Sequence, residues 1–262
     1  MKSRMRAFDL WNMFWRCFLV QGSWNQMSML GLGFGFSAIP FIKRIYKTRK
    51  QRDECLRRHL DFFNSHPYFA SWCLGAVAKL EEEAQRKKWE EYRPIEIFKE
   101  RLVGPLGGIG DRLFWCGLKP AAAGLGILLA LTTGWFAIPI FLIVYNIPHL
   151  LVRIHGLRAG YRKGFDIVSE LSMRRYQKWF DGVDLAGAAV AGACLIAALR
   201  WIWRGGAHPV LSGYPAGIVP LTVFSAALLL TLAALHFNKS RHWTLLGAVL
   251  LGILLSLAWT VA

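Results

Sequence analysis

Stretches without charged side chains alternate along this chain with strongly charged ones, and this alternation predicts its organisation. Residues 1–42 carry aromatic side chains among isolated polar ones, followed by an apolar run that Gly31, Gly33, Gly35 and Pro40 interrupt. This pattern is typical of an amphipathic helix at a membrane surface, followed by a short, broken apolar segment. A buried amphipathic helix in a soluble domain is the alternative.

Residues 43–101 form the first charged stretch, with 15 Lys or Arg and 10 Asp or Glu, and we expect these helical residues to be solvated. Asn64 and His66 offer hydrogen-bond donors and acceptors that suit a hydroxyl-rich ligand, although a histidine before a proline is more often structural. Pro67 disfavours helix at the residue before it, so a helix should end here. Of the three consecutive glutamates at 81–83, at most one should turn inward, and Glu82 is the candidate.

Residues 101–120 contain five glycines and two prolines between a charged half and an apolar half. This predicts a built loop rather than the interior of a helix or strand. Asp111 lies in this loop at the mouth of an apolar segment, where an acidic residue is a functional candidate. The alternative is that the glycines make a tight hairpin and that Asp111 caps a helix starting at Arg112.

The second half of the chain is apolar apart from one basic stretch. Residues 120–152 hold no charged side chain and exceed the roughly 20 residues of one membrane crossing. Gly134, Pro139 and Pro148 interrupt them, which predicts a tilted or broken helix, or a re-entrant pair. Residues 153–184 carry seven Lys or Arg against four acids, which places them in the cytoplasm. Three further apolar runs, at 185–203, 215–235 and 243–261, predict three C-terminal transmembrane helices.

Composition agrees with a membrane protein, because 55% of the 262 residues are hydrophobic and 12 are Trp. A net charge of +16 is expected where Lys and Arg hold cytoplasmic loops beside anionic lipid. The basic residues lie between apolar spans and not on one separable domain, which argues against nucleic-acid binding. Five scattered cysteines form no CxxC pair, so neither a zinc site nor a disulfide framework is indicated. No catalytic constellation or phosphate-binding loop is visible, and no cofactor or metal is implied.

We therefore expect one all-α polytopic membrane domain. It should combine an interfacial amphipathic helix, broken or re-entrant hairpins and several transmembrane helices. Its five segments are 1–42, 43–101, 102–152, 153–184 and 185–262.

Five sequence motifs, in order, carry a family resemblance. They are QGSWN at 21–25, GFGFSAIPFIKRIY at 33–46, RRHLDFFNSHP at 57–67, GPLGGIGDRLFWCGLKP at 104–120 and GYRKGFDIV at 160–168. Together they resemble the IID component of mannose-class sugar phosphotransferase systems over nearly the whole chain. The chain departs from the family pattern at residues 27–30, where relatives usually have a polar tetrad, at Ser65 and Arg112, and in the short segment 205–214.

The resemblance implies a subunit of the bacterial inner membrane that pairs with a IIC membrane subunit in a hetero-oligomer. It further implies cytoplasmic IIA and IIB phosphocarrier components and a hexose substrate of the mannose, fructose, sorbose or amino-sugar class. Phosphoryl transfer runs through histidines on the A and B components, so this chain is expected to carry no catalytic residue.

Nine residues are candidates for lining or bracing a polar path at the IIC interface. They are Asn25, Asn64, His66, Glu82, Gly104, Gly107, Gly108, Gly110 and Asp111. Irregular backbone at membrane depth must be satisfied by protein or by a water-filled cavity, which suits a glycine loop beside a translocation site. Two alternatives stay open: these residues only hold the IIC contact, or the chain is a scaffold or regulatory subunit that does not move sugar.

The charge distribution predicts the orientation of the chain. Single cysteines placed at Lys178 or Lys239 should be protected from a membrane-impermeant thiol reagent added outside intact cells, because both positions lie in basic stretches. A cysteine at the C-terminal Ala262 should react and serves as the control. Labelling at either basic position would contradict this orientation.

Overall fold

The structure, a computed structural model, describes residues 5–203. The chain divides into two compact units, residues 1–191 and 192–262, and the following account concerns the first. Within the described residues it is built from helices, with two isolated β-bridges and no strand. The α-helices are α1 (Ala7–Arg16), α2 (Gly31–Ile45), α3 (Arg49–Leu60), α4 (Ala70–Lys87), α5 (Arg93–Gly110), α6 (Lys119–Thr133), α7 (Ala137–Lys163) and α8 (Met173–Trp203). Shorter segments are the 3-10 helices η1 (Cys17–Leu19), η3 (Gly134–Phe136) and η4 (Gly164–Glu170) and the π-helix η2 (Asp111–Leu118).

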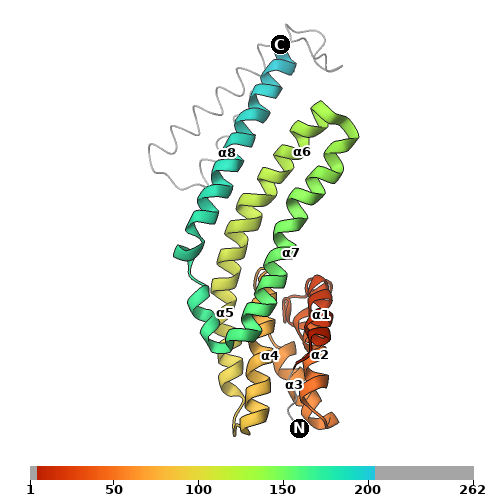
Figure 1. Cartoon of the computed structure of the whole chain (residues 1–262), viewed down its shortest axis with the longest axis vertical. Coiled ribbons are helices and arrows are strands. Elements are labelled where there is room, and N and C mark those ends of the chain that lie inside the picture. The colour runs from red at the N-terminus through yellow and green to blue at the C-terminus, as the bar shows by residue number, and fades with distance from the viewer. Residues whose placement is uncertain (1–4, 204–262) are drawn as a thin grey trace, which may run out of the picture. The chain divides into compact units, whose positions relative to one another are not determined.

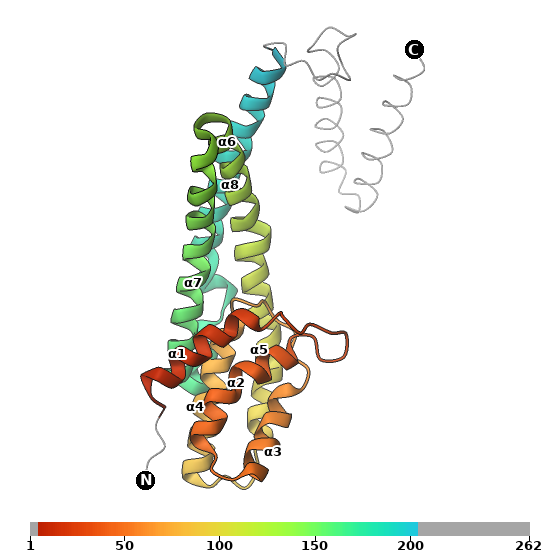
Figure 2. The same cartoon turned by 90° about the vertical axis from the view of Figure 1, so that its right-hand side faces the viewer.

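Helices α6 and α7 lie side by side as a hairpin, whose turn is at the opposite end from the turn between α4 and α5 (Figures 1 and 2). Helices α1 to α4 gather at the base of this hairpin, around the start of α5 and the end of α7. Helix α4 is the central element of this group, because 12 of its 18 residues are buried.

Helices α4 and α7 approach so closely that glycine is required on both of them. A Cβ atom on Gly75 would lie 2.2 Å from the carbonyl oxygen of Leu157, and one on Gly160 would lie 2.2 Å from that of Trp72. Backbone atoms cannot yield as a flexible side chain does, so any larger residue must push the helices apart. The Gly160 position belongs to the last part of α7, which the sequence had assigned to a separate basic segment.

Helix α2 continues across Pro40, which the sequence had suggested as a break. Proline has no N–H, so the carbonyl oxygen of Phe36 loses its normal partner in the helix. Arg16 supplies a replacement, because its Nη1 donates to that oxygen at 3.2 Å while its guanidinium carbon lies 4.4 Å from the centroid of the Phe36 ring. The expected short broken segment is therefore one helix, with ten of its 15 residues buried.

The predicted glycine loop at 101–120 is wrong, because this region is continuous helix. Helix α5 runs through Gly104 and Pro105 to Gly110, passes into the π-helix η2, and continues as α6. The bounds set at residues 102 and 152 accordingly fall inside α5 and α7. A helix forms here despite the closely spaced glycines, because the opposite face of the helix is packed against the protein. Leu102, Leu106 and Ile109, which recur at helical spacing, are buried on that face.

The expectation that residues 43–101 are solvated is also wrong in part. Arg86 and Lys87 are exposed at the end of α4, but most of α4 is core and Lys99 on α5 is only 3% exposed. The many charged residues of this stretch led to the expectation of a solvated region, although α4 carries an apolar stripe. The tertiary structure buries this stripe between α2 and α7.

The apolar stretch 120–152 forms the hairpin of α6 and α7, which turns at η3. Two long helical segments, Arg93–Ala130 with 38 residues and Gly134–Glu170 with 37, have the length and hydropathy to cross a membrane. Large apolar side chains on α7, such as Ile143 at 56% and Leu151 at 61%, are exposed in the isolated chain. The expected run at 185–203 lies within α8, while those at 215–235 and 243–261 and the short segment 205–214 lie outside the described residues.

Substituting Gly160 with Ala should destabilise the protein by about 1–3 kcal/mol, because the added Cβ forces α4 and α7 apart. Thermal unfolding of the detergent-solubilised protein measures this effect. Gly182→Ala on α8 is the matched control, because nothing lies within 4 Å of its Cβ position, and it should be neutral or slightly stabilising. Equal melting temperatures for the two variants would contradict the close packing of α4 on α7.

Candidate functional site at the histidine turn

Residues 61–69, which join α3 to α4, form the candidate site and are called the histidine turn. Its backbone is pinned to the loop before α2: Phe63 N donates to the carbonyl oxygen of Ser28 at 3.2 Å, and Leu30 N donates to that of Phe63 at 2.9 Å. Asn25 shapes this loop, since its Oδ1 accepts from the backbone N of Met27 at 3.0 Å and of Ser28 at 2.9 Å. The structure thus gives Asn25 a local contact that sets the position of the turn.

His66 is the most enclosed polar residue of the turn, with 1% of its surface exposed. Its Nδ1 accepts from the backbone N of Tyr68 at 3.2 Å, which places the ring proton on Nε2. That Nε2 is buried without a hydrogen-bond partner among the described residues. Burial, and then the charge of Arg153, lower the pKa of His66 to about 3, so the ring is neutral at physiological pH.

The π-helix explains how η2 meets this histidine. A π-helix pairs backbone groups five residues apart, and its wider turn brings Phe114 and Trp115 to the same face as Gly110. The His66 ring stacks on Phe114 with centroids 5.4 Å apart and meets Trp115 edge-on at 5.3 Å. A Cβ on Gly110 would lie 2.3 Å from the Cβ of His66, so this contact requires glycine.

Of the remaining candidates on α5, Gly107 is the one that approaches the histidine turn. The Cβ position of Gly107 lies 3.9 Å from the Cα of Ser65, and nothing lies within 4 Å of the Cβ positions of Gly104 and Gly108. Asn64 and Asp111 are exposed. We call Gly104 and Gly108 together the open glycine face.

Glu82 does not join this group. It is half-buried and accepts a hydrogen bond from the hydroxyl of Tyr161 on α7. The glutamate that turns fully inward is its neighbour Glu81, with no exposed surface. The sequence did hold a signal for this. Ala70, Cys73, Leu74 and Val77 form an apolar stripe on the same helix, and Glu81 continues that stripe at helical spacing.

Glu81 connects three helices through its carboxylate. Oε2 accepts from the hydroxyl of Tyr46 at 2.5 Å and from Arg58 Nη2 at 3.1 Å, and Oε1 lies 3.0 Å from His59 Nε2. Burial alone would raise the pKa of Glu81, but the hydrogen bond from His59, the charge of Arg58 and the Tyr46 hydrogen bond lower it to about 2. Burial lowers the pKa of His59, so a neutral imidazole donates from Nε2 to an ionised Glu81.

Lys99 fixes the start of the histidine turn. Its Nζ donates to the carbonyl oxygens of Arg58 and His59, each at 3.3 Å, and of Asp61 at 3.1 Å. These are the free carbonyls at the C-terminal end of α3, where a cation is favourable. Sequence reasoning missed Lys99 and Glu81 because single charged residues inside a charged stretch look solvated.

The described residues contain one group with metal-ligand chemistry, formed by Cys55, His59 and Glu81, whose donor atoms lie within 4.8 Å of one another. This group does not fit a metal ion. Both carboxylate oxygens already accept hydrogen bonds, Arg58 places a positive charge beside them, and burial raises the pKa of the Cys55 thiol well above its usual value. Around the neutral His66, the histidine turn presents aromatic rings and neutral polar groups, which suit recognition of an uncharged partner or ligand.

Comparison with known proteins places the chain among sugar transport subunits. The family model for the PTS (phosphotransferase) system mannose/fructose/sorbose family IID component matches residues 4–261. The mannose-specific EIID component of Escherichia coli K12 is 36% identical over 193 residues, which are 73% of this chain and 68% of that protein. The fructose permease IID component of Bacillus subtilis is 34% identical over 192 residues, covering 73% and 70%.

Two solved structures are similar over 95% of this chain and 96% of their own. One is described as a membrane protein and has a TM-score of 0.71 at 31% identity. The other is the mannose transporter ManYZ in complex with microcin E492, with a TM-score of 0.60 at 30% identity.

Replacing Glu81 with Gln should lower the free energy of unfolding at neutral pH by about 3–5 kcal/mol, because Arg58 would keep a half-buried charge without its partner. Glu83→Gln is the control, since its pairs with Lys79 and Lys87 are partly exposed and should contribute under about 1 kcal/mol. Denaturation in detergent measures both variants.

The same carboxylate predicts a pH dependence. Folding lowers the pKa of Glu81 from 4.5 to about 2. Its contribution to stability is therefore fully present above pH 4.5 and is lost as the pH falls toward 2. The stability gap between the wild type and Glu81→Gln should narrow across this window, and a constant gap would show that the charge of Glu81 is not what stabilises the fold.

Proposed function

This chain belongs to the mannose/fructose/sorbose family of phosphotransferase-system IID components, and from that premise we propose how it works in a sugar transporter. It pairs with a IIC subunit in the bacterial inner membrane, and the two together translocate a hexose of the mannose, fructose, sorbose or amino-sugar class. The cytoplasmic A and B components phosphorylate the sugar, while this chain performs no chemistry itself. Its own contribution is a binding surface and a membrane-spanning frame.

The observation that carries this proposal is the open glycine face beside the histidine turn. Gly104 and Gly108 are four residues apart on α5, inside a segment long and apolar enough to cross a membrane, and no atom of the described residues lies within 4 Å of their Cβ positions. Small residues at this spacing let a second helix approach closely. Asn64 is exposed on the histidine turn and adds a neutral hydrogen-bonding group. A IIC helix seated here would place Asn64 and Asp111 at the subunit boundary.

The lengths of the helices support a cytoplasmic extension. A helix of 38 residues measures about 57 Å, whereas the hydrocarbon core is about 30 Å thick. The charge-free residues 120–152 belong in that core, so the excess of about 27 Å lies at the charged end. The turn between α4 and α5 and the start of α3 then stand clear of the bilayer.

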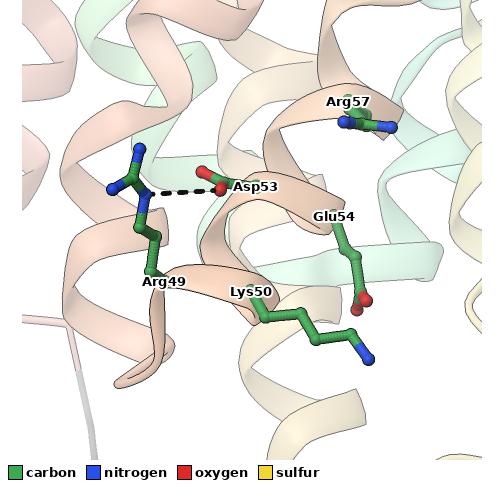
Figure 3. A pocket seen from close by; sticks show the side chains of 5 residues that line it. All are labelled: Arg49, Lys50, Asp53, Glu54 and Arg57. Carbon is green, nitrogen blue, oxygen red and sulfur yellow. Dashed lines mark ion pairs between the residues drawn. The ribbon is translucent and has the colours of Figure 1, made fainter.

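This protruding end offers a charged surface for a soluble partner. Helix α3 carries five Lys or Arg against two acids. A shallow depression on it is lined by Arg49, Lys50, Asp53, Glu54 and Arg57 (Figure 3). Arg49 is paired with Asp53 at 3.8 Å, which leaves Lys50 and Arg57 as exposed cations. We infer that this surface attracts the phosphorylated B component by charge complementarity.

A scaffold or regulatory subunit that keeps the family fold without moving sugar is the second candidate. One observation favours it: Met27 is 91% exposed, in the segment 27–30 where the resemblance would lead us to expect a polar tetrad. Neighbouring reading frames for IIA, IIB and IIC with intact phosphorylation histidines would favour transport, and their absence would favour the scaffold.

Replacing Gly108 with Leu tests the proposed function. The variant chain should keep its own stability, because no atom of the residues that the structure describes lies within 4 Å of the Cβ position of Gly108. It should nevertheless recover at least tenfold less IIC subunit on co-purification and lose sugar uptake in vesicles that contain the full partner set. Gly182→Leu on α8, at an equally open position, should leave assembly and uptake unchanged.

The outcomes separate the candidates. Normal assembly and uptake in Gly108→Leu would refute the role of the open glycine face. Normal assembly of the wild type with no uptake of any hexose of this class would favour the scaffold.

A further inference from the structure

Arg153 on α7 is a buried cation for which the described residues provide no carboxylate. Its residue surface is 4% exposed, and it is the first charged residue after the charge-free stretch 120–152. A guanidinium at this depth is expensive in free energy unless its charge and its donors are compensated. What compensates Arg153 therefore indicates what it does.

The first group that compensates the charge of Arg153 is a backbone carbonyl in η1. Arg153 Nη1 donates to the carbonyl oxygen of Cys17 at 2.5 Å. Cys17 begins η1, directly after α1, so this oxygen belongs to the negative C-terminal end of a helical run. The guanidinium carbon also lies 4.9 Å from the ring centroid of Phe18.

The second group that compensates the charge of Arg153 is an aromatic ring in the histidine turn. The same guanidinium lies 4.9 Å from the ring centroid of Tyr68. Tyr68 in turn stacks on His149 of α7 at 4.6 Å and shares a 3.0 Å hydroxyl contact with Tyr145. Its backbone N is the group that fixes the His66 ring. One side chain therefore contacts η1 and the histidine turn from its place on α7.

We propose that Arg153 is a positioning residue that clamps η1 and the end of the histidine turn against α7. The clamp needs a flat cation, because only a planar guanidinium can cover two aromatic rings while its edge donates to a carbonyl. Lysine carries the same charge as a point and cannot make all three contacts. Removing the clamp releases η1 and loosens Tyr68, and with it the hydrogen bond that orients His66. This inference does not depend on the transport proposal.

The chain contains a native reporter for this clamp. Cys17 has no exposed surface, and burial raises its pKa to about 12, while the charge of Arg153 opposes that rise. Loss of the cation alone would thus make the thiol less reactive. Any gain in Cys17 reactivity must come from its exposure.

The experiment measures alkylation of Cys17 by N-ethylmaleimide in native membranes that contain the full chain, with peptide mass spectrometry as the readout. Arg153→Met should speed the reaction at Cys17 at least tenfold, and Arg153→Lys should give an intermediate rate. Cys73 on α4 has no exposed surface and serves as the internal control for global unfolding, so its rate should not change. Arg158→Met removes an exposed arginine from the same helix and should match the wild type.

Each other outcome overturns part or all of the inference. A wild-type rate at Cys17 in Arg153→Met would show that η1 is held without the clamp. A parallel rise at Cys17 and Cys73 would show global unfolding and no local release. A wild-type rate in Arg153→Lys would remove the requirement for a flat cation.

Discussion

The carboxylate of Glu81 is the interaction on which the rest of this fold depends. Helix α3 is almost entirely polar and buries only Cys55 and His59, so apolar burial cannot hold it against the protein. Glu81 on α4 holds it instead, through Arg58 and His59, and reaches α2 through Tyr46. An ionised carboxylate is stable in this position because each of its oxygens accepts from well-placed donors. The histidine turn begins where α3 ends, so its position follows from this contact.

Two buried cations share one physical solution. Lys99 and Arg153 have no acidic partner in the described part of the chain, and both are placed where helical segments end and carbonyl oxygens are free. Aromatic rings complete their surroundings, with Phe34 5.2 Å from Lys99 and Phe18 4.9 Å from Arg153. Lys99 holds the start of the histidine turn, and Arg153 lies on the ring of Tyr68 near its end. A loop between two helices is thereby held at both ends by cations that belong to other helices.

The π-helix η2 links this turn to the hairpin of α6 and α7. An α-helix through residues 111–118 would not present Phe114, Trp115 and Gly110 together to His66, whereas the wider π turn does. Segments of this kind are common at functional sites, because their backbone geometry is retained only where packing supports it. Here the support comes from the stacked His66 ring and from the ion pair between Arg112 and Asp184 on α8.

The sequence by itself determined the class of this protein. Charge-free runs of membrane length, aromatic residues and basic flanks identified an all-α membrane protein, and five motifs in order identified its family, because hydropathy and motif order are local properties. Only the tertiary structure decided which polar residues are buried. It selected Glu81 over Glu82 and turned Lys99 inward, since the burial of a charge depends on donors contributed by distant helices. It also made helix from the segment of Gly104 to Gly110, because glycine lowers helix propensity by only about 1 kcal/mol per residue and burial of Leu106 and Ile109 offsets that cost.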